Sequence, residues 1–376
     1  MHILTTITFL TLLVVLIYWS LPEKYRYLSV MASAALILFH FSPISLGLLT
    51  LSTLLCYWVL VNIHNTALAS VVVISVLVII FLFFKLSMGF EFNLEENRII
   101  PLGYSYYSFR MIHYAIERYK GTLPTHSFMD FARYLFFIPT LLVGPINRFE
   151  AFLKDYKRLR FDADNIFIGL ERILIGYVKI IVLGNYLFSH KMGLYARVIE
   201  GDYPWLYEYI EMVRFGANAY LQFSGYSDVA IGLALLFGYR IIENFNFPFL
   251  ASNIADFWRR WHISLSSWCR DYIFDPVLAM SRNAIFAAIA TMIILGGWHE
   301  ISFRYIIWGL MHGLAITIWS TYDKKTKHLT IRSHFITKKI LSPIITIHFV
   351  LLSFIIIRDD SLSEAWISIQ KLIFLN

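Results

Sequence analysis

The sequence has 376 residues, of which 58% are hydrophobic and 17% aromatic, and its formal net charge is +7. So large an apolar share excludes an ordinary soluble domain and indicates an integral membrane protein. The two cysteines, Cys56 and Cys269, are too few for a disulfide framework and lack the spacing of a metal site, so we expect no bound metal. Cys269 can act as a nucleophile or as a packing residue, and packing is the commoner role of an unpaired cysteine.

Apolar runs recur along the whole chain, and each run of roughly 17–25 residues can cross the hydrocarbon core of a bilayer as a helix. The pattern predicts an all-α polytopic membrane protein with about ten or eleven transmembrane or re-entrant helices. The predicted helices cover residues 3–20, 27–40, 44–61, 68–90, 131–147, 165–189, 205–222, 226–241, 284–297, 303–321 and 340–357. The first of them is expected to be a retained helix, because no Lys or Arg precedes it as in a signal peptide. Without a repeat or a long linker, residues 1–376 are expected to form a single integral membrane domain.

Basic residues gather in the predicted loops at 24–26, 154–160 and 324–339. An excess of Lys and Arg in short loops marks the cytoplasmic side, so we expect these loops in the cytoplasm and multi-pass insertion into the inner (cytoplasmic) membrane. The acidic residues within 91–96 then lie outside. Because topology explains the positive charge, nothing in the sequence supports nucleic-acid binding.

Polar residues interrupt the apolar pattern at several places. From Pro101 to residue 120, apolar residues recur every three or four positions, which predicts an amphipathic helix at the membrane interface. Gly144-Pro145 is expected to break the next helix. Asp228 falls in an apolar context and is expected either to pair within the helix bundle, with Arg259 or Arg260, or to contact substrate.

The densest polar cluster runs from Asp256 to Asp271, where charges, a histidine and hydroxyls interrupt a lipid-soluble sequence. Ionisable groups near membrane depth are costly, so such a cluster indicates a functional site that lines a water-reachable cavity. The second half of that site is expected in Gly296-Gly-Trp-His-Glu300.

These motifs together resemble the membrane-bound O-acyltransferase family, and in particular its bacterial branch of alginate and peptidoglycan O-acetyltransferase membrane subunits and the teichoic acid D-alanylation protein. The resemblance runs from about residue 100 to 320. It rests on the ordered stretches 101–109, 144–148, 223–232, 243–249, 256–266, 270–272, 297–299 and 308–313.

The resemblance implies a helical bundle around a central tunnel with two important polar positions. One is His299, which matches the histidine of the family's Trp-His pair. The other is His262, where eukaryotic relatives carry Asn or Asp. These two histidines are the candidate catalytic residues.

Acyl transfer from a thioester to a hydroxyl requires removal of the hydroxyl proton and stabilisation of the negative charge that develops on the carbonyl oxygen. A neutral imidazole accepts a proton at physiological pH, so His299 is expected to be the general base. His262 is expected to orient the donor or to stabilise the oxyanion, and a covalent acyl-histidine stays open. His312, about 220° further round an unbroken helix than His299, is expected to be structural, with Gly309 and Gly313 allowing close helix packing.

Further side chains near these histidines are candidates for substrate binding. Arg259 and Arg260 can hold phosphates of a coenzyme or carrier through bidentate contacts, or they can anchor the segment through Asp256 or Asp271. The basic loop at 154–160 can face a cytoplasmic donor or an acidic carrier protein. The remaining candidates are Trp298, Trp261, Ser264, Ser266 and Asp228.

The sequence therefore predicts a membrane-bound O-acyltransferase that moves an acyl group, most plausibly acetyl, from a cytoplasmic thioester donor toward a hydroxyl of a cell-envelope polysaccharide. No permanently bound cofactor is expected, and the donor is acetyl-CoA or an acyl carrier protein. Besides the lipid bilayer, the expected partner is an extracytoplasmic transferase or a carrier protein. Three alternatives stay open: D-alanyl transfer from a carrier protein to teichoic acid, a transporter or channel that uses the His/Arg cluster as a proton or substrate path, and a scaffold that recruits an extracytoplasmic transferase.

Overall fold

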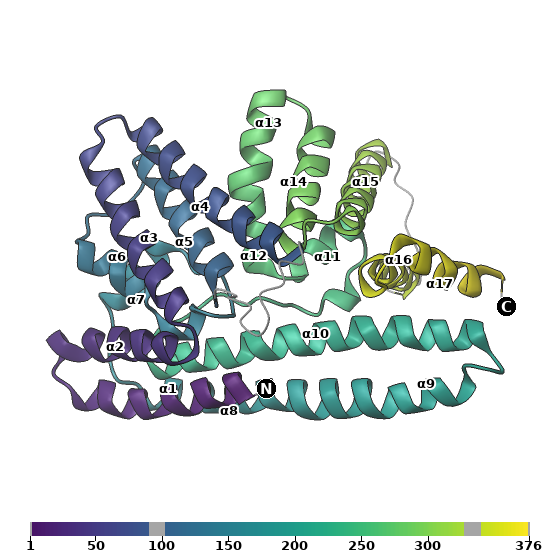
Figure 1. Ribbon diagram of the computed structural model, residues 1–376, viewed down its shortest axis with the longest axis horizontal. Helices are drawn as coiled ribbons and strands as arrows, with labels where there is room; N and C mark the ends of the chain where they lie inside the picture. The colour runs from purple at the N-terminus through teal and green to yellow at the C-terminus, as the bar shows by residue number, and fades with distance from the viewer. Residues whose placement is uncertain (1, 90–101, 327–339, 375–376) are drawn as a thin grey trace. The chain divides into compact units, whose positions relative to one another are not determined.

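The computed structural model describes residues 2–89, 102–326 and 340–374, and within these ranges the chain forms helices joined by turns and loops, without a strand (Figure 1). The expected all-α class is confirmed. Two compact units can be distinguished, one comprising Met1–Gly176 and Tyr226–Ile242, the other Tyr177–Gly225 and Glu243–Asn376. The single membrane domain stays a prediction.

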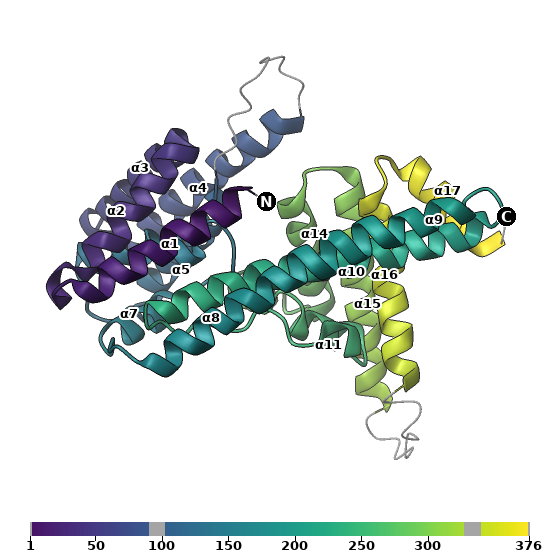
Figure 2. The same cartoon turned by 90° about the horizontal axis from the view of Figure 1, so that it is seen from below.

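The first unit begins with a series of helices in which each packs against the next along the chain, from α1 to α5 (Figure 2). Shorter helices follow, and α8 and the end of α10 complete the unit. Its elements are α1 (His2–Ser20), α2 (Glu23–Phe41), α3 (Pro43–Asn62), α4 (Thr66–Gly89), α5 (Tyr104–Lys120), α6 (Phe128–Leu135), the short 3₁₀ turn η1 (Ile138–Thr140), α7 (Phe149–Tyr156), α8 (Ala163–Tyr177) and the last part of α10 (Pro204–Leu236).

Three described helices are long and apolar enough to cross a bilayer, at Ile3–Ser20, Pro43–Asn62 and Thr66–Leu86. Two shorter apolar helices, Ala284–His299 and Ser342–Arg358, lie further along the chain. The polytopic membrane class is thereby confirmed. The expected total of ten or eleven crossing or re-entrant helices stays a prediction.

The predicted helix over 131–147 is wrong, because α6 ends at Leu135. Pro139 lacks an N–H and its ring would clash with the carbonyl of residue 135, so the helix cannot continue. Arg110 of α5 is only 1% exposed. It satisfies the last two carbonyls of α6 by donating hydrogen bonds to those of Tyr134 (2.7 Å) and Leu135 (3.3 Å). The helix therefore ends before Gly144-Pro145, the position at which the sequence predicts the break.

The amphipathic helix expected after Pro101 is present as α5, although Pro101 and the acidic stretch within 91–96 lie outside the described residues. Several of its polar side chains point into the protein, because Arg110 and His113 are both buried. The Nε2 atom of His113 accepts a hydrogen bond from the backbone N–H of Phe149 at 3.0 Å. α5 thus holds the start of α7 as well as the end of α6.

Helices α8 and α10 approach closely in the first unit. A Cβ atom added to Gly169 would lie 2.8 Å from the carbonyl oxygen of Gly232, so only glycine fits there. One turn away on the same pair of helices, Arg172 donates to Asp228 at 2.7 Å. Asp228 pairs within the bundle as expected, and its partner in the first unit is Arg172.

The prediction of two helices at 205–222 and 226–241 is also wrong, because one helix, α10, runs unbroken from Pro204 to Leu236. The polar side chains that suggested a break find partners instead. Gln222, for example, donates to Asn185 at 2.7 Å and to Asn218 at 3.3 Å. A helix keeps its backbone hydrogen bonds when such side chains are satisfied by their neighbours.

The second unit contains the remaining helices. It begins with the π-helical continuation of α8 and ends with the helix pair at the C-terminus. Its elements are η2 (Val178–Met192), α9 (Gly193–Ile199), the first part of α10, the 3₁₀ turn η3 (Pro248–Leu250), α11 (Ile254–Arg260), α12 (Ile263–Cys269), the π-helical turn η4 (Arg270–Phe274), α13 (Asp275–Ser281), α14 (Ala284–His299), α15 (Phe303–Thr326), α16 (Ser342–Arg358) and α17 (Leu362–Phe374).

Helices α14 and α15 lie side by side in the second unit (Figures 1 and 2). A Cβ atom at Gly309 would overlap the backbone of Met292, and one at Gly313 would lie 2.9 Å from Cα of Ile289. The expectation that these two glycines allow close helix packing is confirmed. Gly296 extends the same contact, because a Cβ there would overlap the carbonyl of Tyr305.

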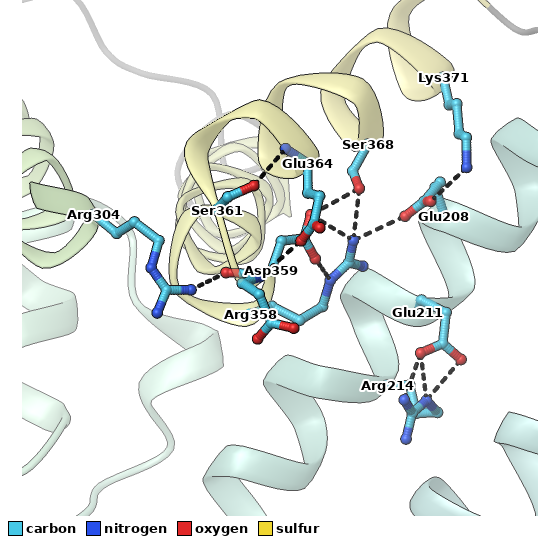
Figure 3. Close-up of polar contacts among 11 residues, drawn as sticks. Glu208, Glu211, Arg214, Arg304, Arg358, Asp359, Ser361, Glu364, Ser368 and Lys371 are labelled. Atoms are coloured by element: carbon cyan, nitrogen blue, oxygen red, sulfur yellow. Dashed lines mark hydrogen bonds and ion pairs between the residues drawn. The ribbon is translucent and has the colours of Figure 1, made fainter. Parts of the chain in front are cut away.

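An ion-pair network ties α16 and α17 to α10 (Figure 3). Arg358, at the end of α16, donates to Glu208 of α10 at 2.9 Å and to Ser368 of α17 at 3.0 Å. Lys371 of α17 donates to the other oxygen of Glu208 at 3.2 Å. Glu208 is buried, so these two cations offset the cost of removing its charge from water.

Candidate functional site

The dense polar cluster 256–271 folds as two short helices, α11 and α12, with His262 in the turn between them. Asn253 caps α11 by accepting a hydrogen bond from the backbone N–H of Asp256 at 2.8 Å. The Asp256 carboxylate in turn accepts from the backbone of Ser252 at 3.1 Å and from Arg260 at 3.0 Å. Asp256 and Arg260 therefore anchor this segment, which is one of the two roles expected for Arg260.

His262 has a left-handed backbone conformation, with φ 46° and ψ 53°. A non-glycine residue adopts this conformation only where the surrounding structure imposes it, at a cost of about 1–3 kcal/mol, and such residues cluster at functional sites. The side chain of His262 is 2% exposed, and neither Nδ1 nor Nε2 has a hydrogen-bond partner among the described residues. Because buried polar atoms are normally hydrogen-bonded, this imidazole is available to a water molecule or a ligand.

Asn244 holds the turn that carries His262. Its side-chain oxygen accepts hydrogen bonds from the backbone N–H of Ser264 at 3.2 Å and from the Ser264 hydroxyl at 2.9 Å. Its backbone carbonyl accepts from the N–H of Ile263 at 2.9 Å. On the other side of the histidine, the backbone N–H of Asn246 donates to the carbonyl of Arg260 at 2.9 Å. These bonds bracket His262 and stabilise its left-handed conformation.

Aromatic side chains surround the His262 imidazole. The ring of Phe223 lies 5.1 Å from it between centroids, and that of Phe245 lies 6.4 Å away. Trp298 connects the two candidate histidines, because its ring lies 6.5 Å from His262 and 4.5 Å from His299. The two segments expected to form one site therefore meet at the Trp298 indole.

The two candidate histidines differ in environment. Burial lowers the pKa of His262 to about 3, and the nearby His299 acts in the same direction, so His262 is neutral at physiological pH. His299 is the last residue of α14, and its side chain is exposed. A buried neutral imidazole can donate one hydrogen bond and accept one, whereas an exposed imidazole can exchange protons with water.

His312 is buried, but unlike His262 it is fully satisfied. Its Nδ1 accepts a hydrogen bond from the Trp258 indole N–H at 3.2 Å, and its Nε2 lies 2.9 Å from the Ser353 hydroxyl. Because that hydroxyl donates to the carbonyl of Val350 at 2.7 Å, Nε2 of His312 must carry the proton. A histidine with both nitrogens engaged in this way has a structural role.

The expected angular separation of His299 and His312 does not apply, because no single helix carries both residues. α14 ends at His299 and α15 begins at Phe303. Instead the Trp308 ring contacts both histidines, with centroids 5.8 Å from His299 and 4.8 Å from His312.

A cavity of about 320 Å³ lies between α11, α12, η4, α14 and α15, next to the His262 turn. Trp258 and Ile263 lie in its wall, and Arg259 and Arg270 supply positive charge. Arg259 is exposed, and its Nε donates to the carbonyl of Ala255 at 3.2 Å. Cys269, which is buried, also lines the cavity. The cavity combines apolar walls with guanidinium groups, which suits an amphipathic anionic group.

Other predicted binding residues serve the local structure. The Ser264 hydroxyl is used by Asn244, and the Ser266 hydroxyl donates to the carbonyl of Trp261 at 2.9 Å, although Ser266 also lines the cavity. Trp261 stacks on Phe257 at 5.4 Å between centroids. Within the described ranges no three His, Cys, Asp or Glu side chains are grouped so that they could hold a metal ion.

Comparison with known proteins shows the family to which the chain belongs. The model of the membrane-bound O-acyltransferase family matches residues 3–357. This protein belongs to that family. It is 34% identical over 290 residues to the probable alginate O-acetylase AlgI of Pseudomonas aeruginosa, a match that covers 74% of this chain and 53% of that protein. It is 28% identical over 321 residues to the peptidoglycan O-acetyltransferase of Helicobacter pylori, covering 74% and 58%, and 31% identical over 282 residues to the teichoic acid D-alanyltransferase of Bacillus subtilis, covering 69% of each.

The chain spans about half the length of the alginate relatives that it matches. Membership of the membrane-bound O-acyltransferase family extends the resemblance seen in the motifs from about residues 100–320 to nearly the whole chain.

In this member of the membrane-bound O-acyltransferase family, Asn244 holds the His262 turn, but the sequence alone did not single it out as a site residue. It belongs to the stretch 243–249, which carries part of the family resemblance but contains none of the candidate site residues. Two asparagines in an otherwise apolar, aromatic loop were the available signal, because a buried amide must have hydrogen-bond partners.

Proposed function

We propose that this protein is an O-acyltransferase that moves an acyl group from a thioester donor on the cytoplasmic side to a hydroxyl of a cell-envelope polysaccharide. The observation that supports it is the group formed by His262, Trp298 and His299. His262 has a left-handed backbone, is buried and has no hydrogen-bond partner among the described residues, whereas His299 is exposed and follows the Trp298 indole that both histidines contact.

The reaction needs one group to move a proton and another to stabilise negative charge. His299 accepts the proton of the acceptor hydroxyl while that oxygen forms a bond to the thioester carbonyl carbon. The neutral His262 donates its N–H to the carbonyl oxygen as it becomes an oxyanion. When the C–S bond breaks, His299 returns the proton to the departing thiolate, so that the products are an ester and a thiol.

Acetyl is the acyl group that two of the relatives favour, since their names describe an alginate O-acetylase and a peptidoglycan O-acetyltransferase. The second candidate is D-alanyl transfer from a carrier protein, because the teichoic acid D-alanyltransferase matches over the same share of both chains. A basic surface cavity of about 320 Å³ beside Lys154, Lys157 and Arg158 fits an acidic carrier protein of that kind.

Replacing His299 by Ala tests the general base. In membranes supplied with labelled acetyl-CoA, we expect acyl transfer to fall by about 10²–10⁴-fold, the usual contribution of a general base. The matched control is His348→Ala, which removes a half-buried histidine of α16 in the same unit. Equal transfer by His299→Ala and wild-type protein at equal expression would overturn the assignment.

The acyl group and acceptor are tested by mass spectrometry of envelope polysaccharides from cells with and without the gene. Loss of O-acetyl groups supports the first candidate, and loss of D-alanyl esters supports the second. Solute flux through proteoliposomes without any acyl turnover would instead favour the transporter alternative.

A further inference from the structure

A second polar cavity lies in the second unit at the end of the hairpin formed by η2, α9 and α10. The chain runs along η2 and α9 to Ile199 and returns along α10 from Pro204, so that α9 lies beside α10 (Figures 1 and 2). The cavity has a volume of about 260 Å³. Its lining comes from both arms and consists of Ser189, His190, Gly193, Leu194, Arg197, Tyr207, Glu211 and Arg214.

Hydrogen-bond donors and positive charge dominate this cavity. Arg197 and Arg214 line the cavity together with one carboxylate, that of Glu211, so these three side chains carry a net charge of +1. Arg214 engages both oxygens of Glu211, with its Nε at 2.8 and 2.9 Å, so this carboxylate is already neutralised (Figure 3). Arg197 is exposed and makes no hydrogen bond or ion pair with any described residue. A planar guanidinium without a protein partner is suited to bidentate contact with a phosphate.

The outer surface next to the cavity is apolar. On α9, Tyr195 is 72% exposed and Val198 is 77% exposed, although both residues are of types that are normally buried. Exposed apolar side chains of η2 continue this surface, namely Ile181, Val182, Tyr186 and Leu187. In a membrane protein such a surface is covered by lipid acyl chains. The positive cavity therefore opens beside a surface suited to lipid tails.

We propose that the cavity lined by Arg197 and Arg214 binds the phosphate headgroup of an anionic phospholipid, whose acyl chains cover the exposed face of η2 and α9. The cavity is slightly smaller than typical small-molecule pockets of roughly 300–1,000 Å³, so it accommodates a headgroup and leaves the chains outside. The Ser189 and Tyr207 hydroxyls add neutral donors beside the guanidinium groups. This site is distinct from the His262 and His299 group and does not depend on the proposed acyl transfer.

The test uses the full-length protein in nanodiscs of phosphatidylcholine with a minor share of phosphatidylglycerol, and it counts retained phosphatidylglycerol by native mass spectrometry. Arg197→Gln should lower its retention about tenfold, since one charge-assisted contact to phosphate accounts for a factor of that order. The variant removes no hydrogen bond or ion pair with a described residue, so folding is expected to be preserved. Arg240→Gln, which makes the same charge change at an exposed residue of the first unit, is the matched control.

Two results would overturn the proposal. One is equal phosphatidylglycerol retention by the Arg197→Gln and Arg240→Gln variants. The other is inorganic phosphate displacing phosphatidylglycerol at similar concentrations, which would make the cavity a free-anion site. Arg197→Lys should bind with intermediate affinity, because it keeps the charge and loses the planar fork.

Discussion

The side-chain oxygen of Asn244 accepts two hydrogen bonds from Ser264, one from its backbone N–H at 3.2 Å and one from its hydroxyl at 2.9 Å. Ser264 lies two residues after His262, whose backbone is left-handed. The free-energy cost of that conformation is offset by neighbouring contacts of this kind. Asn244 is therefore a positioning residue for the His262 imidazole.

Replacing Asn244 by Ala should lower acyl transfer at least tenfold and destabilise the protein by about 1–3 kcal/mol, because the Ser264 donors are left buried without a partner. Asn246→Ala is the control, since Asn246 contributes its backbone N–H to the turn and its side chain is exposed. Transfer assays and thermal unfolding in detergent measure the two effects. If Asn244→Ala lost stability alone and kept wild-type kcat, the positioning role would be wrong.

His262→Asn tests whether this residue acts as a neutral hydrogen-bonding group. With a folded pKa of about 3, His262 stays neutral at every pH above that value, so it cannot produce an activity change between pH 5 and 8. We expect His262→Asn, which keeps a donor and an acceptor, to retain more transfer activity than His262→Ala, which should lose about 10²–10³-fold.

The pH dependence of the same variants separates the roles of the two histidines. The acid limb of the pH–rate profile should keep its midpoint in His262→Asn. A midpoint that moved or disappeared in this variant would show that His262 itself titrates during the reaction, contrary to the proposal.

His312→Leu should destabilise the protein without removing a catalytic group. The Trp258 indole N–H would lose its buried acceptor, at a cost of about 1–3 kcal/mol, whereas the Ser353 hydroxyl would keep its hydrogen bond to the carbonyl of Val350. We expect a lower melting temperature and near-normal transfer per folded molecule. An inactive protein with unchanged melting temperature would contradict the structural role.

Gly309→Ala and Gly297→Ala form a matched pair on α15 and α14. A Cβ at Gly309 would overlap the backbone of Met292, so overpacking should cost about 1–3 kcal/mol despite the better helix propensity of Ala. A Cβ at Gly297 would meet no atom within 4 Å, so that variant should be as stable as wild type or slightly more so. Thermal unfolding measures both, and equal stability of the two variants would argue against close packing at Gly309.

The sequence predicted helices well where one long apolar run makes one helix. The expectation for residues 44–61 matches α3 (Pro43–Asn62), because no charged residue, proline or amide side chain interrupts that run. The helix expected over 131–147 failed although Pro139 was a visible stop signal. The other cause, the hydrogen bonds from Arg110 to the end of α6, joins residues distant in sequence and cannot be inferred from a local pattern.

Contacts between residues distant in sequence also explain why two helices were predicted where α10 is a single helix. Polar residues within an apolar run suggested a break, whereas Asn185 and Arg172 satisfy Gln222 and Asp228 across neighbouring helices. At the candidate site, motif order pointed to His262 and His299 as members of one group, and their common contact with Trp298 brings them together. Their roles stay predictions.

The burial of Arg110 has a consequence for biogenesis. The carbonyls that receive its hydrogen bonds belong to residues 24 and 25 positions later in the chain. When Arg110 emerges from the ribosome, those acceptors are still inside the exit tunnel, and a lone guanidinium is costly to insert into hydrocarbon. We therefore expect α5 to stay in a hydrated environment until α6 has emerged, which couples the assembly of these two segments in time.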